Sequence, residues 1–89
     1  MIFHINDISV THNAMSIIAE RLIDNLAGRA VPPFRVDHFG NREDGIFIIV
    51  SEEGETPLAM QKAKAEVKDA VVSVKNEFRL ERFSGRWIS

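Results

Sequence analysis

Five consecutive apolar residues, Ile46–Val50, limit the folds open to this chain. All five are β-branched or aromatic, and a run of this kind is typical of a strand in the middle of a sheet. The polar segment Gly40–Gly45 precedes it, and before that Phe34–Phe39 alternates between apolar and polar residues, as in a half-buried strand. We therefore predict a hairpin of two strands, the second of them buried on both faces.

A helix is predicted on each side of this hairpin. Asn13 is a favourable N-cap for the first helix, and Gly28 would end it in the left-handed conformation. Thr56 followed by Pro57 marks the start of the second helix, which should run to about Asn76. The residues expected to face the core are Met15, Ile18, Leu22 and Leu26 in the first helix and Met60, Ala63, Val67, Ala70, Val71 and Val74 in the second.

Two further strands are expected near the chain ends. Met1–Ile5 alternates weakly, and either continues or turns at Asn6-Asp7, while Phe78–Phe83 reads as the last strand. Ser84-Gly85 then reads as a turn, and residues 84–89 as a C-terminal tail. The order β-α-β-β-α-β in 89 residues predicts a single α+β domain over residues 1–89. The expected fold is ferredoxin-like, with an antiparallel four-stranded sheet, the third strand central and two helices on one face.

The composition excludes several classes of protein. Apolar residues make up 45% and charged residues 27%, which is too apolar for a disordered chain. The absence of cysteine excludes disulfide scaffolds, thiolate zinc sites and cysteine nucleophiles. No apolar run approaches the length of a membrane span, and the N-terminus lacks the pattern of a signal peptide. We therefore expect a cytoplasmic protein that does not enter a membrane.

Two helices cover only one face of such a sheet, so the other face supplies the candidate binding residues. If Phe34 and Val36 face the helices, Arg35, Asp37 and Phe39 face outward. If Phe78 and Leu80 face inward, Arg79 and Phe83 face outward. The central strand is apolar on both sides, so it adds large side chains to the outer face as well. With His4 from the first strand, the candidate residues are His4, Arg35, Phe39, Phe47, Ile49, Arg79 and Phe83.

An apolar sheet face of this kind needs a cover. The C-terminal tail with Trp87 and Ile88, a second subunit, or a ligand, RNA or partner protein would each supply one. We expect self-association, because exposed apolar patches on small domains most often serve protein contacts. The sequence does not determine the function, and the leading hypothesis is an interaction or binding module that forms a homodimer through its sheet face.

No sequence motif indicates catalysis. The histidines His4, His12 and His38 lack a metal-ligand spacing, and Gly40–Gly45 is not followed by the lysine and hydroxyl residue of a phosphate-binding loop. We expect no metal, no cofactor and no catalytic residue. An alternative is an enzyme or ligand-binding protein, with His4 as a general base beside Arg35 or Arg79. In length, element order and this histidine, the chain is similar to small dimeric α+β-barrel proteins, including relatives of heme-degrading and antibiotic-biosynthesis monooxygenases.

RNA binding on the sheet face is the third hypothesis. RNA-recognition motifs share the predicted element order and stack bases on aromatic residues of the two central strands. Asp44–Val50 lacks the aromatic pair and the leading basic residue of such motifs, and the net charge of the chain is −2. Phosphate contacts require clustered cations. We therefore do not expect a nucleic-acid partner.

Overall fold

The fold is known from a computed structural model, which describes residues 1–29, 31–38 and 45–88; the side chains of His12 and His38 lie outside this description. Its elements follow the predicted order, from strand to helix, through two strands, to a second helix and a last strand. They are β1 (Ile2–Ile8), α1 (His12–Ala27), β2 (Phe34–His38), β3 (Ile46–Val50), α2 (Pro57–Glu77) and β4 (Phe83–Trp87).

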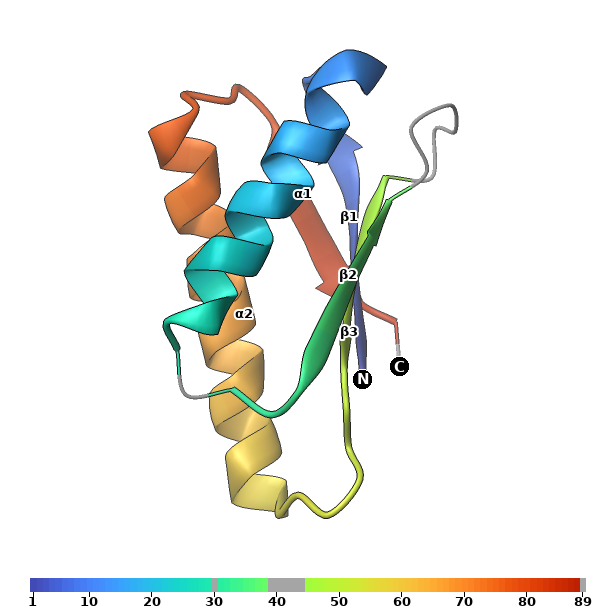
Figure 1. The fold of residues 1–89 in the computed structure, drawn as a ribbon, viewed down its shortest axis with the longest axis vertical. Coiled ribbons are helices and arrows are strands. Elements are labelled where there is room, and N and C mark those ends of the chain that lie inside the picture. The colour runs from blue at the N-terminus through green and yellow to red at the C-terminus, as the bar shows by residue number, and fades with distance from the viewer. Residues whose placement is uncertain (30, 39–44, 89) are drawn as a thin grey trace.

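The four strands form one antiparallel sheet in the order β2-β3-β1-β4, and both helices lie on the same side of it (Figure 1). The α+β class and the antiparallel four-stranded sheet are thus confirmed. The hairpin of β2 and β3 is confirmed by the pairing of Phe34 with Val50 and of His38 with Ile46. The predicted loop at residues 40–45 lies outside the described residues, except for Gly45. β3 is central, as expected, and β1 is the other central strand.

The start of α2 is confirmed. Thr56 is its N-cap, and its Oγ1 accepts a hydrogen bond of 3.1 Å from the amide of Ala59, with Pro57 in the first turn. For α1 the predicted cap is wrong, because the helix begins at His12 with Thr11 as N-cap. The conformation predicted for Gly28 is also wrong. Gly28 is the C-cap, but its φ of −85° lies on the right-handed side, so this helix end does not depend on a left-handed residue.

The core lies between the helices and one face of the sheet. β1 contributes Phe3 and Ile5, and the predicted inner residues of both helices are buried, except Met60, which packs against the core while partly exposed. We expected β3 to be buried on both of its faces, and this is wrong for the single chain. Ile46, Ile48 and Val50 are buried, whereas Phe47 and Ile49 on the other side of the strand are only partly covered, because no helix lies over them.

The predicted position of the last strand is wrong. Phe78 is the C-cap of α2, and β4 begins only at Phe83, which is 2% exposed and faces the core instead of the outer face. Ser84 and Gly85, predicted as a turn, belong to β4 and pair with β1. The register of this pair shifts between Ile5 and Asp7, so β1 runs on to Ile8 through an irregularity instead of turning at Asn6-Asp7.

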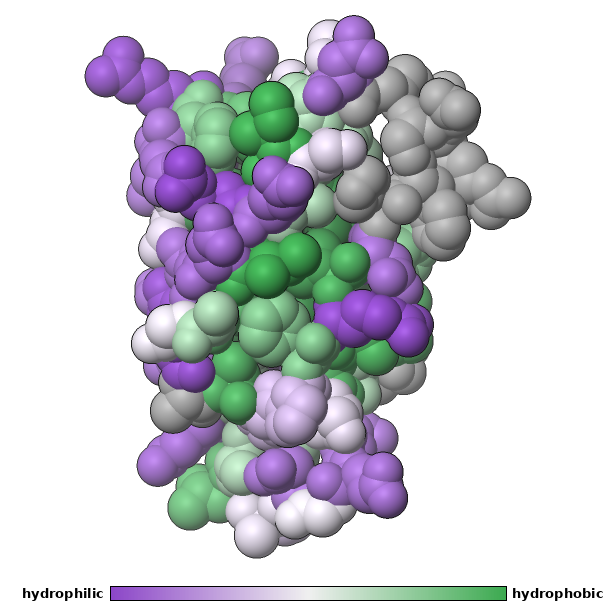
Figure 2. Space-filling view, viewed as in Figure 1, coloured by the Kyte–Doolittle hydropathy of each residue, from purple (hydrophilic) through white to green (hydrophobic). Residues whose placement is uncertain are grey.

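From the side of α1, apolar surface is visible in the middle of the molecule, where the helical layer meets the sheet, and polar side chains border it (Figure 2). Some large apolar side chains remain exposed on the helices; they are Ile17 and Ile23 on α1 and Leu58 and Val72 on α2. Neither described helix has both the length and the apolar character needed to span a membrane.

Candidate functional site

The face of the sheet that the helices leave uncovered is the candidate site, and we call it the open face. Its residues alternate along each strand with the buried ones, and the strand register places them in two rows across the sheet. Ile88 directly follows β4 and stays in register, because its N–H donates to the carbonyl of Ile2 at 2.9 Å. The first row is Arg35, Ile49, Ile2 and Ile88, and the second is Asp37, Phe47, His4 and Arg86.

The middle of the open face is apolar. Ile2, Phe47 and Ile49 are each partly exposed, and Ile88 is 48% exposed. Beside Phe47 lies the imidazole of His4, and the two rings are stacked with centroids 4.2 Å apart and planes 4° apart. The surface is slightly hollowed over Ile2, Asp37, Phe47 and Ile49, with a volume of about 240 Å³. The open face therefore offers a shallow apolar surface and no deep cavity within the described residues.

Charged side chains lie at the two edges of the open face. On the β2 edge, Arg35 Nε and Asp37 Oδ2 form an ion pair of 3.0 Å, with the arginine side chain 70% exposed. On the β4 edge, Arg86 is exposed and has no ion-pair partner in the described part of the chain. The face is therefore apolar in the middle and polar at both rims, which is the usual anatomy of a protein interface.

Four of the seven predicted candidate residues are brought together on this face: His4, Arg35, Phe47 and Ile49. Phe39 lies outside the described residues. Arg79 and Phe83 are not part of the face, because Arg79 is in the turn after α2 and Phe83 is in the core. The prediction omitted Ile2, Arg86 and Ile88. Ile2 follows from the same alternation that placed His4, whereas assigning Arg86 and Ile88 needed the correct start of β4.

Trp87 and Ile88 do not fold back over the open face. Trp87 belongs to β4 and lies on the helix side of the sheet, where its ring contacts that of Phe3 edge-on, with centroids 5.1 Å apart. Lys64 Nζ of α2 lies 5.8 Å from the centre of the same ring. The expectation that Trp87 covers the open face is therefore wrong. A second subunit or another molecule remains as a candidate cover.

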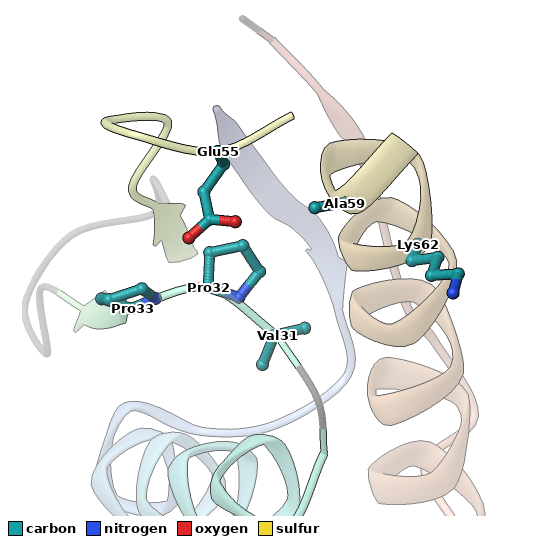
Figure 3. Close-up of a pocket in the computed structure, with 6 residues that line it drawn as sticks. All are labelled: Val31, Pro32, Pro33, Glu55, Ala59 and Lys62. Atoms are coloured by element: carbon teal, nitrogen blue, oxygen red, sulfur yellow. The ribbon is translucent and has the colours of Figure 1, made fainter. Parts of the chain in front are cut away.

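A second hollow of about 370 Å³ lies where the segment before β2 passes the start of α2 (Figure 3). Pro32 stands in its middle, with the carboxylate of Glu55 directed toward the proline ring and Ala59 on the facing helix. Among the described residues that line it, only Glu55 and Lys62 are charged, and both are exposed to solvent. None of these lining residues is a buried polar side chain that could orient a ligand, so we do not treat this hollow as the functional site.

A cluster of charged side chains around Arg29 lies away from the open face. Arg29, just after α1, donates to Asn25 Oδ1 at 2.8 Å and contacts two carboxylates of α2, Asp69 at 2.7 Å and Glu66 at 3.0 Å. The hydrogen bond to Asp69 is the main cause that raises the pKa of Arg29, and burial opposes it. This cluster fastens the end of α1 to α2, and every charge in it has a partner, so it has a structural role.

The described side chains show no metal site, since they include no group of three histidines or carboxylates placed around one point. A site that included His38 is not tested, because the side chain of His38 is outside the description. Comparison with known proteins gives no relatives: no family model matches the chain, and no curated protein or solved structure is significantly similar to it.

Proposed function

We propose that this protein is a small interaction module that forms a homodimer by packing the open faces of two sheets together. The observation that supports it is the contiguous apolar surface of Ile2, Phe47, Ile49 and Ile88 across three neighbouring strands, in a sheet whose other face is already occupied by helices. We further propose that the fold is ferredoxin-like, since β1 and β2 are joined through α1 and run parallel with β3 between them.

Removal of this apolar surface from water is the driving force for association. Removing one large aliphatic or aromatic side chain from solvent is worth roughly 1.5–3 kcal/mol. Each chain would contribute its own copy of every side chain to a symmetric interface. Because Ile49 is already partly covered within each chain, two copies of it account for only about 1 kcal/mol, which corresponds to about fivefold in the dissociation constant.

A cytoplasmic setting is part of the proposal, and the composition supports it. A chain without cysteine has no disulfide that would require an oxidising compartment, and we place the protein in the cytoplasm.

The alternative function, a ligand-binding or catalytic site on the same face, has weaker support. The hollow on the open face is lined by three apolar residues and one carboxylate, and Arg79 lies elsewhere. RNA binding also has weak support, because an ion pair already uses one of the two arginines on the face.

Analytical ultracentrifugation over a concentration series tests the proposal. The wild-type chain should sediment as a dimer at micromolar concentration, and Ile49→Lys should shift it to monomer. Ile49→Thr, which keeps a β-branched residue in the strand, should weaken the dimer by about fivefold or more. Val72→Lys is the matched control, because Val72 is a 53% exposed apolar residue on α2, and it should leave the dimer unchanged.

Two results would contradict the proposal. One is a wild-type chain that stays monomeric at high micromolar concentration. The other is a dimer that survives Ile49→Lys but dissociates with Val72→Lys or Ile17→Lys, which would assign association to the helical side. Circular dichroism of each variant separates loss of the dimer from loss of the fold.

A further inference from the structure

The positions of the charged residues at the two edges of the open face favour one orientation of a second copy. Asp37 on β2 and Arg86 on β4 belong to the same row, at opposite edges of the sheet. Three strand spacings separate them, about 14 Å, so they do not pair within one chain. They can pair between two chains only when the second sheet packs on the first with its β4 edge over the first sheet's β2 edge.

We infer that the second copy binds about a two-fold axis that runs along the strands between β1 and β3, so that Asp37 of each chain meets Arg86 of the other. This inference rests on the proposed homodimer and specifies its geometry. Rotation about such an axis places β2 over the partner's β4 and β3 over the partner's β1, and it keeps each residue in its own row. The strands of the two sheets then run nearly aligned, which is a favoured way for sheets to pack.

The same rotation gives the apolar residues apolar partners. Ile49 comes to lie over the partner's Ile2, and Phe47 over the partner's His4, which extends the ring stack already present within each chain. Asp37 keeps its ion pair with Arg35 and accepts a second cation, because a carboxylate has two oxygens and about four lone-pair sites. Arg86 gains the partner that it lacks among the described residues of its own chain.

The competing orientation has its two-fold axis across the strands. It lays β2 over the partner's β2 and β4 over the partner's β4. Arg35 then meets the partner's Asp37, so an ion pair within the chain is merely exchanged for one between chains. Arg86 meets Ile88 or the other Arg86, which leaves the arginine charge without a partner or places two like charges together. The axis along the strands gives each of Arg35, Asp37 and Arg86 an opposite charge, and the axis across them leaves Arg86 without one.

A mixing experiment with two charge-reversed chains tests the orientation. Asp37→Arg alone places arginine against Arg86 twice in its homodimer, and Arg86→Asp alone places aspartate against Asp37 twice. Each variant should therefore dimerise at least about tenfold more weakly than the wild type. In the mixed dimer, each contact joins one acid to one arginine. Native mass spectrometry of an equimolar mixture should thus show the mixed dimer well above the statistical half of all dimers.

This test includes a matched control and a second pair of variants for the case that a charge reversal unfolds the chain. Asp24→Arg reverses an exposed charge on α1, away from the face, and should neither weaken the homodimer nor favour mixed dimers. If a charge reversal unfolds the chain, Asp37→Asn and Arg86→Gln replace it. Their combined effect on the dissociation constant should be smaller than the product of the single effects, because both remove the same contact.

The outcomes separate this inference from the proposed function. The axis along the strands would be overturned if the two charge-reversed chains form mixed dimers at the statistical half and if Asp37→Asn and Arg86→Gln have multiplicative effects on the dissociation constant. The homodimer itself would stand in that case, provided that Ile49→Lys dissociates it. A wild-type chain that is monomeric, or a dimer indifferent to Ile49→Lys, would overturn both the homodimer and its orientation.

Discussion

The imidazole of His4 lies flat against the phenyl ring of Phe47, with ring centroids 4.2 Å apart and planes 4° apart. The two residues are direct cross-strand partners on the central strands β1 and β3. They stand side by side in the middle of the open face, which no helix covers. A face-to-face pair at this position fixes both side chains in one conformation, so the face is preorganised before any partner arrives.

We predict that His4 and Phe47 stabilise the fold together. His4→Leu and Phe47→Leu, each alone and combined, form a double-mutant cycle whose coupling should be about 0.5–1 kcal/mol, as expected for a cross-strand aromatic pair. Urea unfolding at submicromolar concentration, where association contributes least, measures it. Strictly additive effects would show that the stacked geometry makes no net contribution to stability.

A second prediction concerns Gly85, where β4 crosses the irregularity of β1. A Cβ built on Gly85 would overlap the carbonyl of His4 and the Cα of Ile5, and neither backbone group is free to move inside the sheet. Gly85→Ala should therefore lower the free energy of unfolding by about 2–3 kcal/mol. Chemical denaturation measures the change, with Ser84→Ala at the exposed neighbouring position as control. Equal midpoints for Gly85→Ala and the wild type would show that the strands do not approach so closely.

Gly85 also explains why the end of the fold was not predicted. From the sequence, Ser84-Gly85 looks like a turn, since glycine is the commonest turn residue. In the structure this glycine is needed because another backbone passes close by, a tertiary constraint that local sequence does not contain. The misplaced turn then shifted the strand register and exchanged the faces, so Phe83 was assigned to the open face although it lies in the core.

The parts of the site that were predicted are those with local determinants. Alternation assigns the face of Arg35 in β2, and the short hairpin carries this assignment to β3, because Ile49 pairs with Arg35 and Phe47 with Asp37. Thr56 and Pro57 likewise start α2 through contacts within one turn. Ile88 joins the face only through pairing of the two chain ends, and nothing in a periodic pattern reports which strands become neighbours.

The third prediction is a stabilising substitution at Arg79. α2 ends in a Schellman motif, in which Leu80 N–H donates to Lys75 and Arg79 N–H to Asn76, and Arg79 occupies the left-handed position with a φ of 51°. A left-handed conformation costs a residue with a Cβ about 1–2 kcal/mol, and glycine avoids most of it. Arg79→Gly should thus raise the free energy of unfolding by about 0.5–1 kcal/mol.

Arg79→Ala is the control for this change. Alanine removes the same charge and side chain but keeps the Cβ, so it should give no comparable gain in urea unfolding. Equal stabilisation by alanine and glycine would assign the effect to the loss of the arginine charge and would contradict the backbone explanation.

The last prediction concerns the pH dependence of the Arg29 cluster. The hydrogen bond to Asp69 raises the pKa of Arg29 in the folded protein above its ordinary value. A group with a raised pKa stabilises the fold at every pH below its unfolded pKa, and this contribution is lost only as the pH rises through the folded pKa. For an arginine both values lie far above pH 10. Arg29→Met should therefore lower the free energy of unfolding by about 1 kcal/mol, equally at pH 7 and pH 10.

Arg29→Lys supplies the contrast, because lysine has an ordinary pKa of about 10.4 and lacks the planar fork that binds two carboxylates at once. Its contacts with Glu66 and Asp69 should be retained in part at pH 7 and pH 10 and be lost only as the pH rises above about 10.4, so near pH 11.5 its unfolding curve should move toward that of Arg29→Met. Urea unfolding of the wild type and both variants at pH 7, at pH 10 and at about pH 11.5 measures this. A destabilisation by Arg29→Met that vanishes at pH 10 would show that the cluster does not depend on an arginine that stays charged.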